Sequence, residues 1–149
     1  MDSSFVAENA RELERLKELV GRLTDEQLEA MLNEYWSVAG ILAHVAFYDG
    51  RALFMAGKLA RTEPFTPDDD EPENVDWIND SMRPLLHAIP PRQAAELALA
   101  IAEETDQAIA SLPPGAIAKI DDGSPLNPFR SYHRREHVDE IEEFLKTNG

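Results

Sequence analysis

Residues 129–144 read FRSYHRREHVDEIEEF and contain His133 and His137, two of the four histidines of the chain. At about 100° per residue on an α-helix, the two imidazoles lie one turn apart and can reach the same point beside the helix. Phe129, Glu140 and Phe144 fall within roughly 40° of His133 on the helical wheel. The pattern therefore predicts an amphipathic helix whose inward face carries two histidines.

The N-terminal half of the chain predicts two further long helices and a connector. Apolar residues recur at steps of three and four between residues 6 and 23, which predicts a helix over residues 4–21. Thr24 and Gln27 have the spacing of a capping box and indicate a short connecting helix. Ser37 is a good N-cap for a helix over residues 37–60, and His44 lies at the edge of its apolar stripe. A third histidine is thus expected to face inward.

The remaining segments complete an all-α pattern. Residues 75–112 predict a long, bent third helix that is interrupted at Pro90 and Pro91. The acidic loop before it, which includes DDDEPENVD, has no glycine and so does not fit a calcium-binding EF-hand loop. Asn127 and Pro128 are expected to open the last helix as N-cap and first residue. We therefore expect one domain, residues 1–149, folded as a four-helix bundle with long crossover connections.

Composition limits the partners and the compartment that we expect. The 149 residues include 14 Lys+Arg against 29 Asp+Glu, a net charge of -15, so phosphate backbones and anionic membranes should repel the chain. No signal sequence and no apolar stretch long enough to span a bilayer is recognised, which predicts a cytoplasmic protein without nucleic-acid or membrane partners. The chain has no cysteine, so any thiol chemistry needs an external thiol.

Three inward histidines predict a divalent metal site. A lone histidine on an apolar stripe is usually a hydrogen-bonded core residue, but three neutral imidazoles can ligate zinc, nickel or iron and leave positions open for water or substrate. His87 lies near a predicted helix end, where a surface or capping role is expected instead. Residues 133–137 also spell HxxEH, the inverted zinc-protease motif with Glu136 as general base, yet the chain ends twelve residues later and leaves no room for a downstream ligand.

Two stretches resemble the DinB/YfiT-like superfamily of small metal-binding four-helix bundles. Residues 36–49, WSVAGILAHVAFYD, are similar to its segment around the first ligand histidine, and residues 132–144, YHRREHVDEIEEF, are similar to its closing HxxxH helix. The resemblance implies that His44, His133 and His137 bind one divalent ion. It also implies a homodimer. The implied activity is that of an enzyme that uses mycothiol, bacillithiol or glutathione, either by transferring the thiol to a small-molecule substrate or by isomerising the substrate.

Other residues have candidate roles around this centre. Arg130 is a candidate for holding a carboxylate of such a thiol, although a structural salt bridge is the more common role of a residue in this position. Glu136 is a candidate catalytic base, with a solvated helix surface as the alternative. Three residues could orient the ligand histidines: Tyr48, Asp49 and Glu140. Asp76 and Asn79 are candidates for lining the pocket. Two other function classes remain open, a metal-dependent hydrolase that activates water and a non-catalytic bundle that binds a ligand or dimerises.

Overall fold

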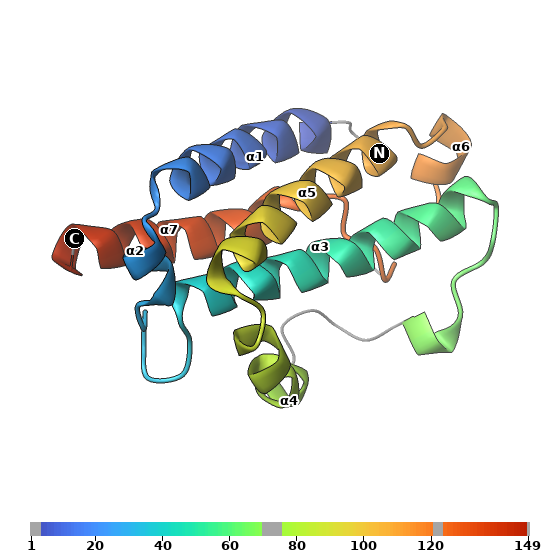
Figure 1. The fold of residues 1–149 in the computed structure, drawn as a ribbon. Helices are drawn as coiled ribbons and strands as arrows, with labels where there is room; N and C mark the ends of the chain where they lie inside the picture. Colours follow the sequence, from blue (N-terminus) through green and yellow to red (C-terminus); the bar gives the residue numbers. More distant parts are fainter. Residues whose placement is uncertain (1–3, 70–75, 121–123, 149) are drawn as a thin grey trace.

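The computed structural model describes residues 4–69, 76–120 and 124–148, and within these ranges every regular element is a helix (Figure 1). The prediction of an all-α chain is therefore confirmed for the described residues. The parts of the acidic loop at residues 70–75 and of the turn at residues 121–123 lie outside them. In chain order the elements are α1 (Ser4–Arg22), α2 (Asp25–Glu29), α3 (Val38–Ala60), the 3-10 helix η1 (Pro67–Asp69), α4 (Asp76–His87), α5 (Pro91–Ala110), α6 (Pro114–Ile117) and α7 (Ser131–Asn148).

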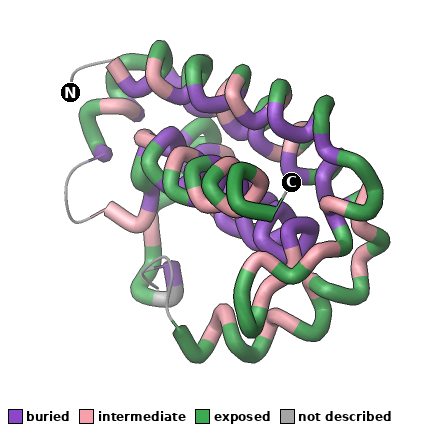
Figure 2. Tube along the Cα trace, turned by 90° about the vertical axis from the view of Figure 1, so that its left-hand side faces the viewer, coloured by how far each residue is buried: buried purple, intermediate pink, exposed green. Residues whose placement is uncertain are grey.

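The four longest helices are α1, α3, α5 and α7, and each contacts at least two of the others. Contacts join α3 to α5, α5 to α1, α1 to α7 and α7 to α3. Figure 2 shows that the buried stretches of these helices face one another, while the outward turns are exposed. Apolar stripes at helical spacing are thus removed from water on one side of each helix, which is the main source of stability for such an arrangement.

Two predicted helix starts are present in the structure. The Thr24 hydroxyl accepts a bond from the Gln27 amide at 3.1 Å, and the Gln27 side chain accepts one from the Thr24 amide at 2.9 Å. The Ser37 hydroxyl accepts a bond from the Gly40 amide at 2.9 Å and caps α3. These bonds satisfy N–H groups that have no partner within the helix, so α3 begins at a defined residue and His44 falls in its second turn.

Small residues form the contact between α3 and α5. Four alanines of α5 have no exposed surface: Ala94, Ala95, Ala98 and Ala102. Three alanines of α3 lie in the same core cluster: Ala39, Ala43 and Ala46. Side chains of this size let the two helix backbones approach closely. The position of α3, which carries His44, is thereby set against α5.

The last helix begins later than predicted. Asn127 and Pro128 precede the helix, which starts at Ser131. The side chain of Asn9 in α1 accepts a bond from the Ser131 amide at 2.9 Å and donates one to the Pro128 carbonyl at 2.8 Å. A residue more than a hundred positions away therefore caps α7, and sequence-local signals for an N-cap could not identify it.

The predicted long, bent third helix is two separate helices. α4 ends at His87 and α5 begins at Pro91, with Pro90 between them as the residue before the first turn. Neither proline has an N–H to continue the ladder of α4, whereas Pro91 suits the first turn of a new helix. In Figure 1, α4 lies outside the layer formed by α3 and α5, and none of its residues is fully buried.

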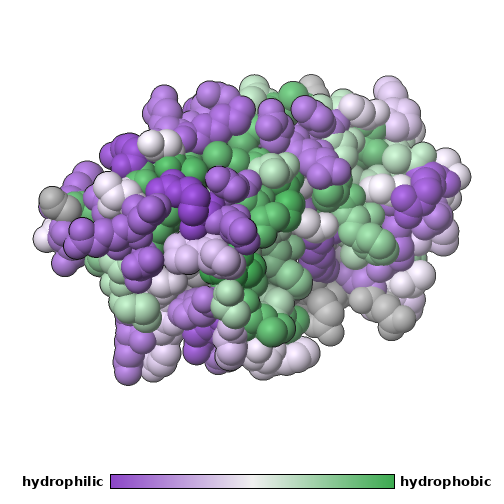
Figure 3. All heavy atoms as spheres, in the orientation of Figure 1, coloured by the Kyte–Doolittle hydropathy of each residue, from purple (hydrophilic) through white to green (hydrophobic). Residues whose placement is uncertain are grey.

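α3 is long and apolar enough to be considered as a membrane span, contrary to the expectation that no such stretch exists. However, 72% of the relevant window is buried inside the protein. The apolar side chains of α3 are thus accounted for by core packing with its neighbours. Figure 3 shows that hydrophilic and hydrophobic side chains both reach the surface on the face that carries α3 and α5. Phe54 and Leu97 border an apolar groove there, of about 520 Å³.

Candidate metal centre

Three histidines from two helices meet in the interior. His44 lies in the second turn of α3, and His133 and His137 lie one turn apart at the start of α7. Their exposed fractions are 3%, 5% and 8%. The ring centroid of His44 lies 4.9 Å from the ring centroid of each of the other two histidines. The His133 and His137 centroids are 4.6 Å apart. The structure therefore brings together the three residues predicted as metal ligands.

The Nε2 atoms of the three rings converge. His133 Nε2 lies 3.0 Å from His44 Nε2 and 3.1 Å from His137 Nε2. In tetrahedral zinc sites each ligand nitrogen lies about 2.0–2.1 Å from the metal, which puts two such nitrogens about 3.3 Å apart. The observed separations are close to that value. Among the described residues, these three form a group that could hold one metal ion.

The environment of His133 keeps its ring neutral. Burial lowers the pKa of His133 to about 2, and the nearby His137, His44, Arg130 and Arg134 act in the same direction. An imidazole coordinates a metal only in its neutral form, because the protonated ring has no lone pair to donate. His133 is therefore in its ligating form at neutral pH without any loss of a proton on metal binding.

Glu140 orients one of the ligand rings. Its Oε2 atom lies 3.4 Å from Nδ1 of His137, and the hydrogen bond from His137 holds the pKa of the Glu140 carboxyl below its usual range. An Nδ1–H that donates to a carboxylate leaves the lone pair on Nε2, the atom that faces the other histidines. This contact agrees with the orienting role considered for Glu140 from the sequence.

Aromatic rings enclose the histidines. The Tyr48 ring lies 5.0 Å from the His44 ring and 5.4 Å from the His133 ring, and its hydroxyl donates a hydrogen bond to Asn79 at 2.8 Å. The Trp36 ring lies 5.6 Å from the His44 ring. Packing of this kind restricts ring rotation and limits the access of water, both of which strengthen electrostatic interactions at the centre.

A pocket of about 280 Å³ leads from the surface to the histidines. Its walls include His44 and His137, both buried, together with Glu136, Asp76 and Asn79. Glu136 is exposed and stands beside His137 on α7. The structure thus places Glu136 and the α4 residues at the opening to the histidine centre. A molecule in this pocket would contact the centre directly.

Arg130 and Asp49 lie away from this pocket. Arg130 has no exposed surface, and its Nε donates a hydrogen bond to Asp49 Oδ1 at 3.0 Å. The other oxygen of Asp49 accepts a bond from Arg134 Nε at 2.9 Å. For Arg130 the structure therefore shows the salt bridge that was the alternative to thiol binding. Asp49 faces two guanidinium groups, not the ligand histidines whose orientation was considered for it.

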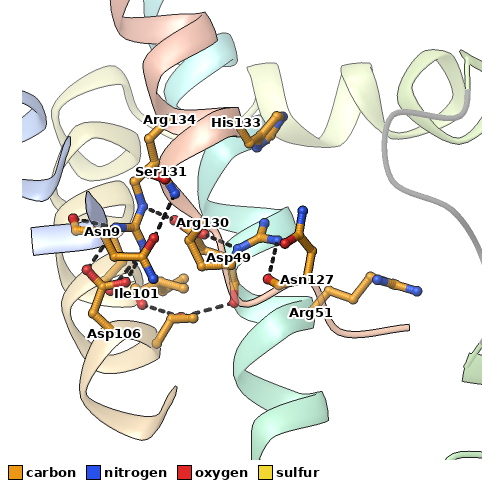
Figure 4. A network of polar contacts seen from close by, with 12 residues as sticks. Asn9, Asp49, Arg51, Ile101, Asp106, Asn127, Arg130, Ser131, His133 and Arg134 are labelled. Atoms are coloured by element: carbon orange, nitrogen blue, oxygen red, sulfur yellow. Dashed lines mark hydrogen bonds and ion pairs between the residues drawn. The ribbon is translucent and has the colours of Figure 1, made fainter. Parts of the chain in front are cut away.

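The Asp49 bonds belong to a buried ion-pair network that sequence analysis missed (Figure 4). Arg134 also binds both oxygens of Asp106 in α5, at 2.7 and 2.8 Å. Figure 4 shows Arg134 and His133 leaving α7 in different directions, so the network and the centre occupy neighbouring regions. The only sequence signal was that Arg134 lies about 100° from His133 on the helix, next to its inward face. The network fixes the rotation of α7 and hence the direction of His133.

The fourth histidine, His87, lies outside the centre. It is exposed in the last turn of α4, and its ring lies 5.5 Å from the Trp36 ring in an edge-on arrangement. The ring approaches Gly40 in the first turn of α3 so closely that a Cβ there would collide with it. His87 therefore contributes to the contact between α4 and α3, and it is not in the group that could hold a metal.

Comparison with known proteins identifies a family. The sequence matches the family model described as the DinB superfamily over residues 8–138, a range that includes all three histidines of the centre. The search of curated proteins gave no match, and neither did the search of solved structures. Evidence on function thus comes from the family match and from the geometry of the centre.

Proposed function

The chain belongs to the DinB superfamily, and from this premise we propose that it binds one divalent metal ion through His44, His133 and His137. The observation that carries the proposal is the convergence of three buried Nε2 atoms, with 3.0 and 3.1 Å between neighbouring atoms. Zinc, nickel and iron all accept imidazole ligands. The ring of contacts among α1, α3, α5 and α7 supports the finer description of the fold as a four-helix bundle.

We further propose that the protein is an enzyme that activates a low-molecular-weight thiol for attack on a small electrophilic substrate. When bound, a divalent ion would lower the pKa of a thiol or water molecule beside it, since its positive charge is not cancelled by neutral ligands. The pocket of about 280 Å³ gives a small molecule a path to the histidines. Trp36 and Tyr48 enclose the inner side, and Glu140 holds the ring of His137 in place.

One observation also favours a second candidate, a hydrolase. Glu136 lines the pocket beside His137 and is exposed, so its carboxylate can accept a proton from a water molecule in the pocket. A hydrolase would turn over without added thiol, whereas a thiol transferase would not. Turnover of a panel of electrophiles and esters with and without thiol therefore separates the two activities.

Metal content tests the proposal. Untagged wild-type protein, His44→Ala, His133→Ala and the control His87→Ala would be measured by elemental mass spectrometry after reconstitution with zinc, nickel or iron. We expect near-stoichiometric metal in the wild type and in His87→Ala, and loss of metal in the two centre variants, with helical circular dichroism retained. Absence of metal from the reconstituted wild type would overturn the proposal and leave three hydrogen-bonded core histidines.

A further inference from the structure

The pocket beside the histidines carries negative charge and no cationic side chain. Its walls include the carboxylates of Asp76, Glu136 and Glu140, and no lysine or arginine of the described chain lines it. The convergence of His44 and His137 at the same pocket is an independent sign that a ligand belongs there. The acids therefore surround an opening that leads to a binding centre, unlike acids on an open helix face.

Two arginines near the histidine centre do not line the pocket. Arg130 is buried against Asp49. Arg83 lies over the Trp36 ring, 5.1 Å from its centroid, and pairs with Asp80 through one terminal nitrogen, while its Nε is buried without a hydrogen-bond partner. Neither arginine lines the pocket. A carboxylate of a bound molecule would thus find no cationic side chain of the described residues to receive it in the pocket.

The pocket remains negative even with a metal in the centre. The two positive charges of a divalent ion would face three carboxylates and three neutral imidazoles. Glu140 lies at the inner side of this group, with its Oε2 atom 3.4 Å from Nδ1 of His137. Asp76 and Glu136 are exposed, and no ion pair of either residue is seen within the described part of the chain. Their fields act on whatever enters the opening.

These charges indicate the class of thiol, an inference that rests on the proposed thiol-dependent function. We propose that the pocket selects a small thiol with a cationic amine group over a thiol with an anionic group, and that Asp76 and Glu136 determine this specificity. The cationic group gains attraction from the carboxylates, while an anionic group is repelled by them. Both residues lie at the pocket opening, where the part of the molecule farthest from the thiol would be.

Three thiols of similar size test the proposal. Thiocholine carries a quaternary ammonium, 2-mercaptoethanesulfonate carries a sulfonate, and 2-mercaptoethanol is neutral. Their affinities for cobalt-loaded protein would be measured by the sulfur-to-cobalt charge-transfer absorption, a readout that needs no turnover. We expect thiocholine to bind at least about tenfold more tightly than the sulfonate, since attraction and repulsion add, and the ratio to shrink in high salt.

Charge-deleting variants identify the residues responsible. In Asp76→Asn and Glu136→Gln, we expect the ratio between thiocholine and the sulfonate to fall about two- to fivefold each, as for exposed charge pairs. Glu143→Gln, an exposed acid of α7 outside the pocket, is the matched control and should leave the ratio unchanged. The different acidities of the free thiols contribute equally in every variant, so they cannot imitate this result.

The outcomes separate this inference from the function on which it rests. Protein that binds no cobalt would overturn the metal proposal. If none of the three thiols produces a charge-transfer band with the cobalt-loaded protein, the thiol proposal is overturned, and the specificity with it. Bands with all three thiols, but equal affinities or a ratio unchanged in Asp76→Asn and Glu136→Gln, would overturn the specificity alone.

Discussion

The Nε2 atom of His44 lies 3.0 Å from the Nε2 atom of His133, although 89 positions separate the two residues. The same two helices are joined by ion pairs close to these residues. Asp49 lies five positions after His44 on α3, and Arg134, the neighbour of His133, donates to it at 2.9 Å. The buried ion pairs hold the two helices in one register, and the histidine nitrogens meet because of that register.

Removal of the Asp49 carboxylate should be strongly destabilising. In Asp49→Asn, the buried guanidinium groups of Arg130 and Arg134 lose a shared counter-ion, and a broken buried pair costs about 3–5 kcal/mol. Asp139→Asn is the matched control, because Asp139 pairs with Arg15 at the surface and should cost less than about 1 kcal/mol. Urea unfolding measures both losses. Equal losses in the two variants would show that the buried network does not contribute this stability.

Glu140→Gln should weaken metal binding while the fold remains. The glutamine cannot accept the His137 Nδ1–H as a charged partner, and loss of such a second partner typically lowers metal affinity about 10–100-fold. Competition with a chromogenic chelator gives the affinity. Glu143→Gln removes an acid from the same helix without a contact to the histidines, so its affinity should equal that of the wild type. A loss of the same size in Glu143→Gln would point to a general charge effect.

The metal-free protein should lose stability as the pH falls below about 6.5. The pKa of His133 in the folded protein is lowered to about 2 by burial, while the unfolded chain has the ordinary value of about 6.5. The unfolded state therefore gains a proton that the folded state does not, so this contribution is fully present above pH 6.5 and is lost on acidification. One such group changes the free energy of unfolding by about 1.4 kcal/mol per pH unit.

Urea unfolding between pH 6.5 and 5 measures this dependence, since most carboxyl groups titrate below that window. His133→Gln keeps a neutral polar group that cannot titrate. The free energy of unfolding of this variant should therefore depend less steeply on pH, by the equivalent of one proton taken up on unfolding. Parallel curves for the wild type and His133→Gln would mean that His133 takes up a proton in the folded protein as readily as in the unfolded chain.

Ala98→Leu should disrupt the contact between α3 and α5. Ala98 has no exposed surface and lies in the core cluster with alanines of α3, so three additional carbon atoms have no space. Overpacking of this kind costs about 1–3 kcal/mol. Ala100→Leu, an exposed position of the same helix, is the control and should be close to neutral. Thermal unfolding distinguishes them, and similar melting temperatures for both variants would contradict close packing at Ala98.

The sequence alone was sufficient for features that depend on local spacing. Apolar periodicity predicted most of the long helices, and local side-chain bonds at Thr24 and Ser37 set the starts of the short α2 and the long α3. The placement of His133 and His137 on one face follows from the helical repeat, which depends only on their separation of four residues. These features need no knowledge of distant partners.

The tertiary structure decided everything that depends on how helices are rotated and paired. α7 starts at Ser131 because Asn9 caps it from α1, and the Arg130 side chain lies against Asp49 of α3. The helical repeat places a side chain on a face, but the energy of a buried charge or ligand nitrogen depends on which atoms from other helices lie within a few ångströms. Only the packed structure supplies those atoms, and so only it shows that His44 completes the centre.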